Sequence, residues 1–195
     1  MPIREVMIYG EPVLRRKARP VRGEETERLF ADMIETLIEE VGLGLAAPQV
    51  GAPLQVIVVR EDAEPEQEIH RLLNPRIIHR SREEECTREG CLSLPTLRAD
   101  VWRPERVVVT GRTPEGEKIE LEAEGMLARA VQHEIDHLRG VLFTDRAEPE
   151  TLVWMIPDEE EEDGFKFEPT TLREAQEAFE RLRRRRAAKR TGEGA

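Results

Sequence analysis

The chain has 195 residues, a length that fits one domain of ordinary size with a short appendage. Charged residues make up 36% and aromatic residues 4% of the chain, so a core must consist mainly of Leu, Ile, Val and Ala. The net charge of −11 excludes a general nucleic-acid coat, because binding along phosphates requires neutralising cations, but it leaves a local basic patch open.

The N-terminal segment MPIREVMIYG carries charges where a signal peptide would place its apolar run. No stretch approaches the roughly 18 consecutive apolar residues that indicate a membrane span. Cys86 and Cys91 are too few for a disulfide framework, and a reducing compartment would keep them as free thiols or metal ligands. We therefore expect a cytoplasmic protein.

The first predicted element is an amphipathic helix over residues 24–41, which Gly42 is expected to end. Its apolar residues at helical spacing are Leu29, Met33, Ile34, Leu37, Ile38 and Val41. The next segment, GLGLAAPQVGAPLQ, is punctuated by Gly and Pro and predicts a loop. LQVIVV then predicts a buried strand, and LLNPRIIH predicts another that is broken at Asn74 and Pro75.

A hairpin and a second helix follow. WRPERVVVTG and KIELEAEG flank the turn signal RTPEGE, which predicts a β-hairpin. Gly125 precedes MLARAVQHEIDHL, which predicts a largely buried helix. This order does not alternate as a parallel sheet requires, so the predicted fold class is α+β: mostly antiparallel strands wrapped around a central helix that carries HEIDH, with a C-terminal helical extension.

The composition changes after Pro157. DEEEEDG predicts a solvated acidic linker, and TTLREAQEAFERLRRRRAAKR predicts a helix whose start is marked by Thr171 and Glu174. We therefore expect a catalytic domain over residues 1–157 and, over residues 158–195, an acidic linker with a basic C-terminal helix. Two interpretations of the basic RLRRRRAAKR end stay open: it docks on ribosomal RNA, or it is a solvated face.

His133 and His137 lie four residues apart and therefore on one face of the predicted helix. Two imidazoles so placed can reach one metal ion at about 2.0–2.1 Å. The intervening Glu134 completes H-E-x-x-H, in which the Glu acts as general base. The alternative is that both histidines only satisfy local hydrogen bonds in the core.

A catalytic divalent metal requires a third protein ligand and one open position. Downstream, the position of the metzincin histidine is Phe143, and the DEEEEDG run has no apolar face to hold an acidic ligand in place. Upstream, Cys91 in EGCLSLP offers a thiolate, and catalytic sites accept mixed sulfur and imidazole ligands. We therefore predict that Cys91, His133 and His137 bind the metal, and that Cys86 is a packed or idle thiol.

Three segments together resemble the three motifs of the peptide deformylase family, in the same order and with matching spacing. GLGLAAPQ (residues 42–49) resembles the first motif, EGCLS (residues 89–93) the second and QHEIDH (residues 132–137) the third. The flanking segments YGEPVLRRKARPV and LRGVLFTDR are also similar. The resemblance covers most of residues 1–147, so the tail lies outside it.

The resemblance implies hydrolysis of the N-formyl group from the formyl-methionine of nascent polypeptides, with release of formate. A divalent metal lowers the pKa of its water to ~7, and Glu134 is placed to accept that proton and return it to the leaving amine. The resemblance further implies that the Gln49 amide and the Leu92 backbone N–H stabilise the oxyanion. It favours Fe²⁺, although one Cys and two His also suit Zn²⁺, Ni²⁺ or Co²⁺.

The resemblance also implies that the substrate backbone binds between the segments around Gly44 and Gly90. The expected lining of the methionine pocket is Leu43, Met126 and Ala130. Candidates that orient the metal ligands, or that form plain structural ion pairs, are Glu89, Arg98 and Asp136. Two other functions stay open at this point: an H-E-x-x-H metallopeptidase that cleaves internal peptide bonds, and a non-enzymatic metal- or ribosome-binding relative.

Overall fold

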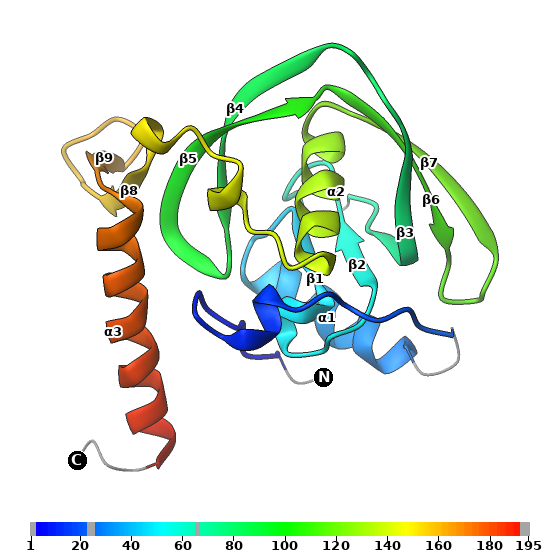
Figure 1. The fold of residues 1–195 in the computed structure, drawn as a ribbon, viewed down its shortest axis with the longest axis horizontal. Helices are drawn as coiled ribbons and strands as arrows, with labels where there is room; N and C mark the ends of the chain where they lie inside the picture. The colour runs from blue at the N-terminus through cyan, green and yellow to red at the C-terminus, as the bar shows by residue number, and fades with distance from the viewer. Residues whose placement is uncertain (1–2, 23–25, 65–66, 192–195) are drawn as a thin grey trace.

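The computed structural model describes residues 3–22, 26–64 and 67–191 of the chain (Figure 1). The α-helices are α1 (Glu27–Glu39), α2 (Gly125–Leu138) and α3 (Leu172–Thr191). The strands are β1 (Gly44–Ala46), β2 (Val56–Val59), β3 (His70–Arg80), β4 (Glu84–Cys91), β5 (Leu94–Pro104), β6 (Arg106–Arg112), β7 (Lys118–Glu124), β8 (Val153–Pro157) and β9 (Phe165–Pro169).

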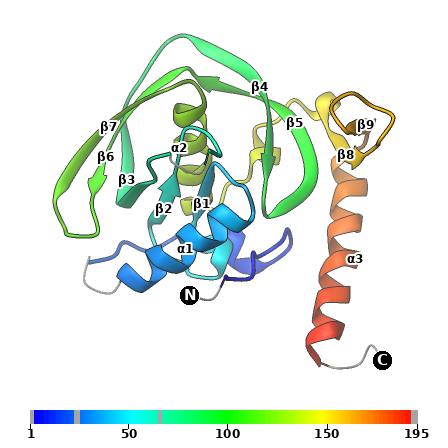
Figure 2. The same cartoon turned by 180° about the vertical axis from the view of Figure 1, so that it is seen from behind.

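The strands form two sheets whose pairings are antiparallel. One sheet has the order β1-β2-β3-β6-β7 and the other the order β4-β5-β8-β9. Figures 1 and 2 show α2 enclosed between the two sheets, with α1 below β1 and β2 and α3 on the outside. This arrangement confirms the predicted α+β class, with a central helix and a C-terminal helical extension. None of the helices in the described part of the chain is long and apolar enough to cross a membrane.

Helix α2 is the centre of the fold. Its Val131, Ile135 and Leu138 pack against Ile57 and other apolar side chains of the five-stranded sheet. Every residue from Ala128 to Leu138 is buried, including six polar or charged ones. Buried polar groups destabilise a fold unless they form hydrogen bonds or ion pairs. The polar side of α2 therefore indicates a functional site rather than a packing surface.

The predicted helix over residues 24–41 is observed as α1, although its first predicted residues, 24 and 25, lie outside the described ones. The prediction was wrong at the other end. Val41, not Gly42, adopts the left-handed conformation, with φ of 52°, and the Gly42 N–H donates to the Leu37 carbonyl at 3.0 Å. A β-branched residue in this conformation costs about 1–2 kcal/mol, and Ile38 and Val41 are exposed instead of buried.

Three local predictions were confirmed and two were incomplete. The strands β2 and β3 and the β6–β7 hairpin form as expected, and β3 changes register after Leu73, where Asn74 has φ of 51°. The predicted loop after Gly42 instead contains β1 and the 3₁₀ helix Ala47–Val50, because this segment pairs with β2 and is buried. The β4–β5 pair was not predicted, and Trp102 belongs to β5, not to the β6–β7 hairpin.

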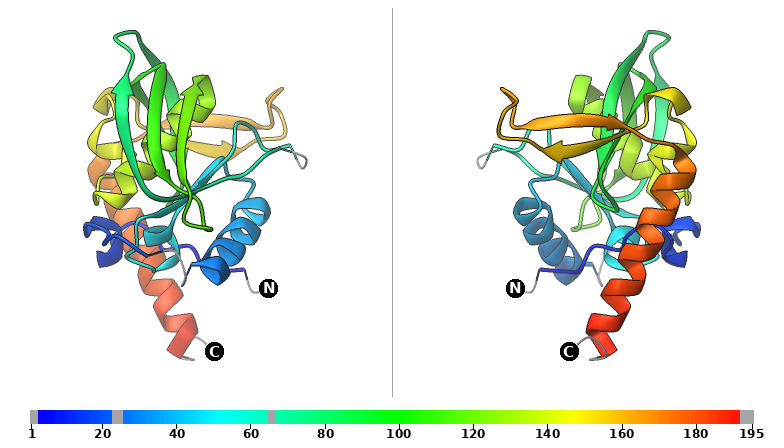
Figure 3. Two further views of the ribbon diagram at one scale, coloured as in Figure 1. Left: turned by 90° about the vertical axis from the view of Figure 1, so that its right-hand side faces the viewer. Right: turned by 90° about the vertical axis from the view of Figure 1, so that its left-hand side faces the viewer.

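The acidic segment Asp158–Gly164 connects two strands that were not predicted, β8 and β9. Strand β8 pairs with β5 through Leu97 and Trp154, so the hairpin extends the second sheet. Figure 3 shows the hairpin projecting from one side of the molecule, with α3 running away from it. The proposed boundary at residue 157 stays a prediction.

Helix α3 begins with the expected capping box. The Thr171 N–H donates to Glu174 at 2.9 Å, and the Glu174 N–H donates to the Thr171 hydroxyl at 3.2 Å. The helix then packs through Ala175 and Phe179, and the Phe179 ring lies 5.5 Å from that of Trp154. The C-terminal helix is therefore docked on the hairpin as well as on the N-terminal segment.

Candidate metal centre

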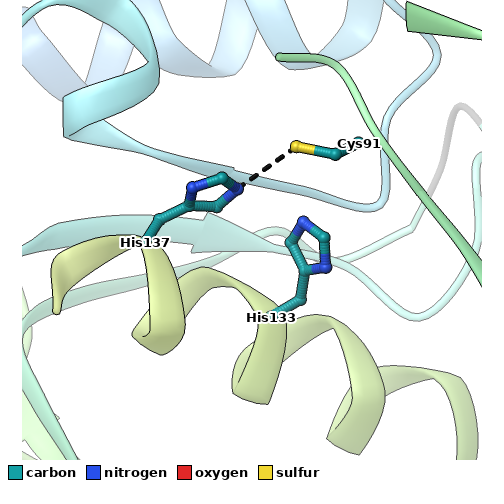
Figure 4. A group of neighbouring side chains, drawn as sticks. All are labelled: Cys91, His133 and His137. Carbon is teal, nitrogen blue, oxygen red and sulfur yellow. Dashed lines mark hydrogen bonds between the residues drawn. The ribbon is translucent and has the colours of Figure 1, made fainter. Parts of the chain in front are cut away.

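Cys91, His133 and His137 converge at one point. Their potential ligand atoms all lie within 4.8 Å of one another, and Cys91 Sγ is 3.2 Å from His137 Nε2. Figure 4 shows the thiol and both imidazole rings meeting above α2. Metal bonds of about 2.0–2.3 Å place ligand atoms roughly 3–4 Å apart, so this buried set fits one divalent cation.

The end of β4 brings the thiol to the helix. Gly90 pairs with Arg98, but Cys91 pairs with Leu94, so the register shifts between these two adjacent residues. Such a bulge bends a strand and re-aims its side chains. Residues 92 and 93 then form the turn into β5, and Cys91 is left buried.

Glu89 orients the first histidine. Its carboxylate lies 3.0 Å from His133 Nδ1, which leaves Nε2 of the ring directed at the cluster. The same carboxylate accepts hydrogen bonds from Arg103 at 2.5 Å and from Arg129 at 2.7 Å. Asp136 does not contact His133 in this network; it accepts from Arg103 at 2.9 Å and so joins it through that side chain.

The sequence analysis missed Arg103 and Arg129. Their signal is weak, because the chain contains 30 Lys and Arg residues and nothing in the sequence marks these two as buried. In the structure both side chains are almost fully buried between α2 and the β4–β5 pair. Ion pairs with these two guanidinium groups offset the free-energy cost of burying the charged Glu89 carboxylate.

Burial and partners shift the pKa values of these groups. Burial acts to raise the pKa of Glu89, but hydrogen bonds with His133 and Arg103 hold it well below its usual range. Burial acts to lower the pKa of His133, yet its contacts with Cys91 and Glu89 raise it well above the usual value. Burial lowers the pKa of His137, and the charge of His133 lowers it further.

Glu134 points into the open space beside the cluster. It is 3% exposed, and its Oε2 has no hydrogen-bond partner among the described residues. A Cβ atom at Gly44 would lie 2.5 Å from Glu134 Oε1, so β1 approaches the carboxylate this closely only because residue 44 is glycine. Burial raises the pKa of Glu134 to about 7, a value suited to accepting and returning a proton near neutral pH.

Gln49 lies beside Cys91 of the cluster. Its Oε1 accepts a hydrogen bond from the Ala46 N–H at 2.7 Å, which fixes the orientation of the amide. The Nε2 group is then directed at Cys91 Sγ, 3.5 Å away. Leu92 follows Cys91 in the turn and lines the same space.

A cavity of about 450 Å³ opens beside the cluster. Among the residues predicted for the site, His137 and Asp136 do not line it. Those that do are Leu43, Gly44, Gln49, Glu89, Gly90, Cys91, Leu92, Arg98, Met126, Ala130, His133 and Glu134. Gly42, the first residue of the GLGLAAPQ motif, also lines it, together with residues that were not predicted: Glu40, Val41, Arg88, Pro95, Thr96, Arg129 and Met155.

Arg98 and Cys86 are the remaining residues that the sequence analysis singled out. Arg98 packs directly against Gly90 and donates to the Leu97 carbonyl at 3.0 Å, so its recorded hydrogen bond goes to the backbone, not to a candidate ligand. Cys86 was expected to be a packed or idle thiol, and it is a free thiol exposed on β4, which fits the second alternative.

The chain is similar to proteins of known family. The family model described as polypeptide deformylase matches residues 3–152. The peptide deformylase of Natranaerobius thermophilus is 48% identical over 150 residues, which are 76% of this chain and 94% of that protein. The crystal structure of peptide deformylase from Thermotoga maritima superposes with a TM-score of 0.71 at 38% identity and covers 76% of this chain and 100% of that one. The peptide deformylase from Thermus thermophilus gives 0.69 at 44% identity and covers 74% and 85%.

Removing the charge of Glu89 tests the buried network. Glu89→Gln leaves two buried guanidinium groups short of a carboxylate, and we expect the free energy of unfolding to fall by about 3 kcal/mol. Glu83→Gln is the matched control, because Glu83 forms an exposed ion pair with Arg106 at 2.8 Å. This substitution should change the free energy of unfolding by less than about 1 kcal/mol. Urea unfolding at equal metal content measures both. Equal losses in the two variants would contradict a structural role for the network.

Proposed function

The chain belongs to the peptide deformylase family, and from this premise we propose how its cavity removes the N-formyl group of formyl-methionine from nascent polypeptides. The similar proteins named above are deformylases, which favours this reaction over internal peptide-bond cleavage by an H-E-x-x-H metallopeptidase. The observation that carries the proposal is the convergence of Cys91, His133 and His137 beside the buried carboxylate of Glu134, whose Oε2 has no partner among the described residues.

Cys91, His133 and His137 are the residues that would hold the metal. The donor set fits a divalent cation: one thiol and two imidazoles, all buried, with Glu89 fixing the tautomer of His133. When bound, such a cation supplies Lewis acidity, which polarises a carbonyl oxygen and lowers the pKa of water. We propose Fe²⁺ as the physiological ion, with Zn²⁺, Ni²⁺ or Co²⁺ as substitutes, because all four accept mixed sulfur and nitrogen ligands.

Glu134 acts as the general base and then as the general acid. Glu134 lines the cavity and its Oε2 has no partner among the described residues, so the carboxylate is available to a water molecule or a substrate amine. The carboxylate takes a proton from the attacking water and gives it to the departing amine nitrogen, which releases the peptide with a free N-terminus and formate. Because burial raises the pKa of Glu134 to about 7, the carboxyl group can hold this proton between the two steps.

Gln49 and Leu92 stabilise the oxyanion. The Gln49 amide is held by the Ala46 N–H, so its Nε2 group donates toward the cluster without rearrangement. The Leu92 backbone N–H provides the second donor from the turn after Cys91. Donors that are fixed before the reaction lose no free energy in reorganising as charge develops, and each is worth about 10²–10³ in turnover.

The remaining cavity residues bind the substrate. We propose that the peptide backbone lies between β1 at Gly44 and β4 at Gly90, and that the methionine side chain contacts Leu43, Met126 and Ala130, which line the cavity. Asp136 supports Glu89 through Arg103, and Arg98 supports the backbone beside Gly90.

The location and the basic helix complete the proposal. We propose a cytoplasmic protein, because both cysteines are free thiols and a thiolate ligand requires a reducing environment.

We also propose that α3 docks on ribosomal RNA. Arg183 and Arg186 donate to the carbonyls of Gly10 and Val6, so they attach α3 to the N-terminal segment. The exposed cations that would contact phosphates are Arg181, Arg185 and Lys189.

Replacing Glu134 tests the mechanism. We expect Glu134→Ala to bind the same amount of metal as the wild type and to release formate from formyl-Met-Ala about 10²–10⁴ times more slowly, because the proton acceptor is lost. Glu122→Ala removes an exposed carboxylate of β7 and should leave the rate within about twofold, since it affects no step of general acid–base catalysis. Equal rates for Glu134→Ala and the wild type, at equal metal content, would remove Glu134 from the mechanism.

Charge reversal on α3 tests ribosome docking. We expect the triple change of Arg181, Arg185 and Lys189 to Glu to abolish co-sedimentation with ribosomes at ~50 mM salt, and wild-type binding to weaken at ~200 mM, because phosphate contacts are salt-dependent. The charge-matched control changes Arg76, Arg80 and Arg82 to Glu; all three are exposed on or next to β3, away from α3. Unchanged co-sedimentation of the α3 variant, or equal loss in the control, would contradict docking through this helix.

A further inference from the structure

One wall of the active-site cavity comes from outside the matched family segment. The family match ends at residue 152, yet Met155 of β8 lines the cavity together with Cys91 and Glu134. The hairpin β8–β9 is therefore more than a support for α3, because it places a side chain where substrate binds.

The bulge in β5 explains how β8 reaches the cavity. Three residues, 95–97, intervene on β5 where the register shifts, and the last of them, Leu97, pairs with Trp154 of β8. Pro95 and Thr96 of the same bulge line the cavity. Since Met155 follows Trp154 directly, the pairing holds it next to these two residues.

The hairpin has two different faces. Successive side chains of a strand point to opposite sides, and Trp154 contacts Phe179 of α3, so Met155 faces away from α3. Met155 pairs with Phe167 of β9, whose ring centroid lies 4.8 Å from the guanidinium carbon of Arg88. Arg88 also lines the cavity. Met155, Phe167 and Arg88 therefore form one surface, which we name the hairpin subsite.

The hairpin subsite lies beyond the formyl-methionine position. Arg88 precedes Cys91 by three residues of β4, a distance of about 10 Å at ~3.3 Å per residue. An extended peptide spans the same distance with about three residues. A substrate whose formyl group is at the cluster would thus bring its second or third side chain to the part of the cavity that Arg88 lines, and Arg88 belongs with Met155 to the hairpin subsite.

We propose that Met155 is a specificity-determining residue that contacts an apolar side chain at the second or third position of the substrate. The inference rests on the proposed binding of formyl-methionine in this cavity. Met155 and Phe167 offer a thioether and an aromatic ring, both suited to apolar partners. The positive charge of Arg88 is already engaged, since it stacks on Phe167 and pairs with Asp100 at 3.2 Å. The group of three side chains therefore offers mainly apolar and aromatic surface to a substrate residue.

Two peptide series test the proposal, formyl-Met-X-Ala and formyl-Met-Ala-X, with X either Phe or Ser. We expect the wild type to hydrolyse the Phe peptide with a kcat/KM about tenfold above that of the Ser peptide in at least one series, as a partly buried apolar contact provides. In Met155→Ala this ratio should fall to about two, and in Met155→Leu, which keeps an apolar side chain, it should stay near the wild-type value.

Ile156→Ala is the matched control. Ile156 is the next residue of β8, on the opposite face of the strand, and does not line the cavity, so its ratio should equal that of the wild type. A wild-type ratio near one in both series, a ratio unaffected by Met155→Ala, or an equal fall in Ile156→Ala would overturn the proposal. Failure of the deformylase mechanism is distinct, because the wild type would then release formate from none of these peptides.

Discussion

The carboxylate of Glu89 is the contact on which both the metal centre and the packing of α2 depend. It binds His133, Arg103 and Arg129 at once, and Arg129 also donates to the Val101 carbonyl at 3.0 Å. The end of β4, the middle of β5 and the face of α2 are thereby joined through one buried charge. Because a buried carboxylate without partners would destabilise the fold by several kcal/mol, the three elements are held in the one arrangement that also brings Cys91 to the two histidines.

Other residues around the cavity have features that do not stabilise the fold. Glu134 Oε2 and His137 Nδ1 are buried without a hydrogen-bond partner among the described residues, a pattern typical of a site that binds water or an ion. Val41 holds a left-handed conformation where its neighbour Gly42 would do so without strain. These departures lie next to the cavity, whereas the apolar side of α2 shows regular packing. Non-glycine residues in strained backbone conformations are enriched at functional sites, and Val41 lines the cavity.

The parts of the site that depend on local geometry were predictable from the sequence. The spacing of His133 and His137 determines that they share a helix face, and Thr171 with Glu174 predicts the start of α3. The thiol of Cys91 followed from ligand chemistry and from the resemblance. The arginine partners of Glu89 and the position of Met155 were not predictable, because they depend on how β4, β5 and β8 pair. Strand β4 (EECTREGC) is mostly polar and β8 (VWMIP) mostly apolar, so neither shows the alternation that marks a half-buried strand; in β5, Leu97, Ala99 and Val101 do alternate with polar residues, but that pattern does not say which strands β5 pairs with.

The central claim is that one sulfur and two imidazole nitrogens bind a single cation. The most direct test is the X-ray absorption spectrum, at the zinc edge, of protein loaded with one zinc ion per chain. We expect one sulfur at about 2.3 Å and two nitrogens at about 2.0–2.1 Å, with the sulfur lost in Cys91→Ser and kept in Cys86→Ser. A spectrum that contains only nitrogen and oxygen neighbours, or a sulfur that survives in Cys91→Ser, would contradict the account.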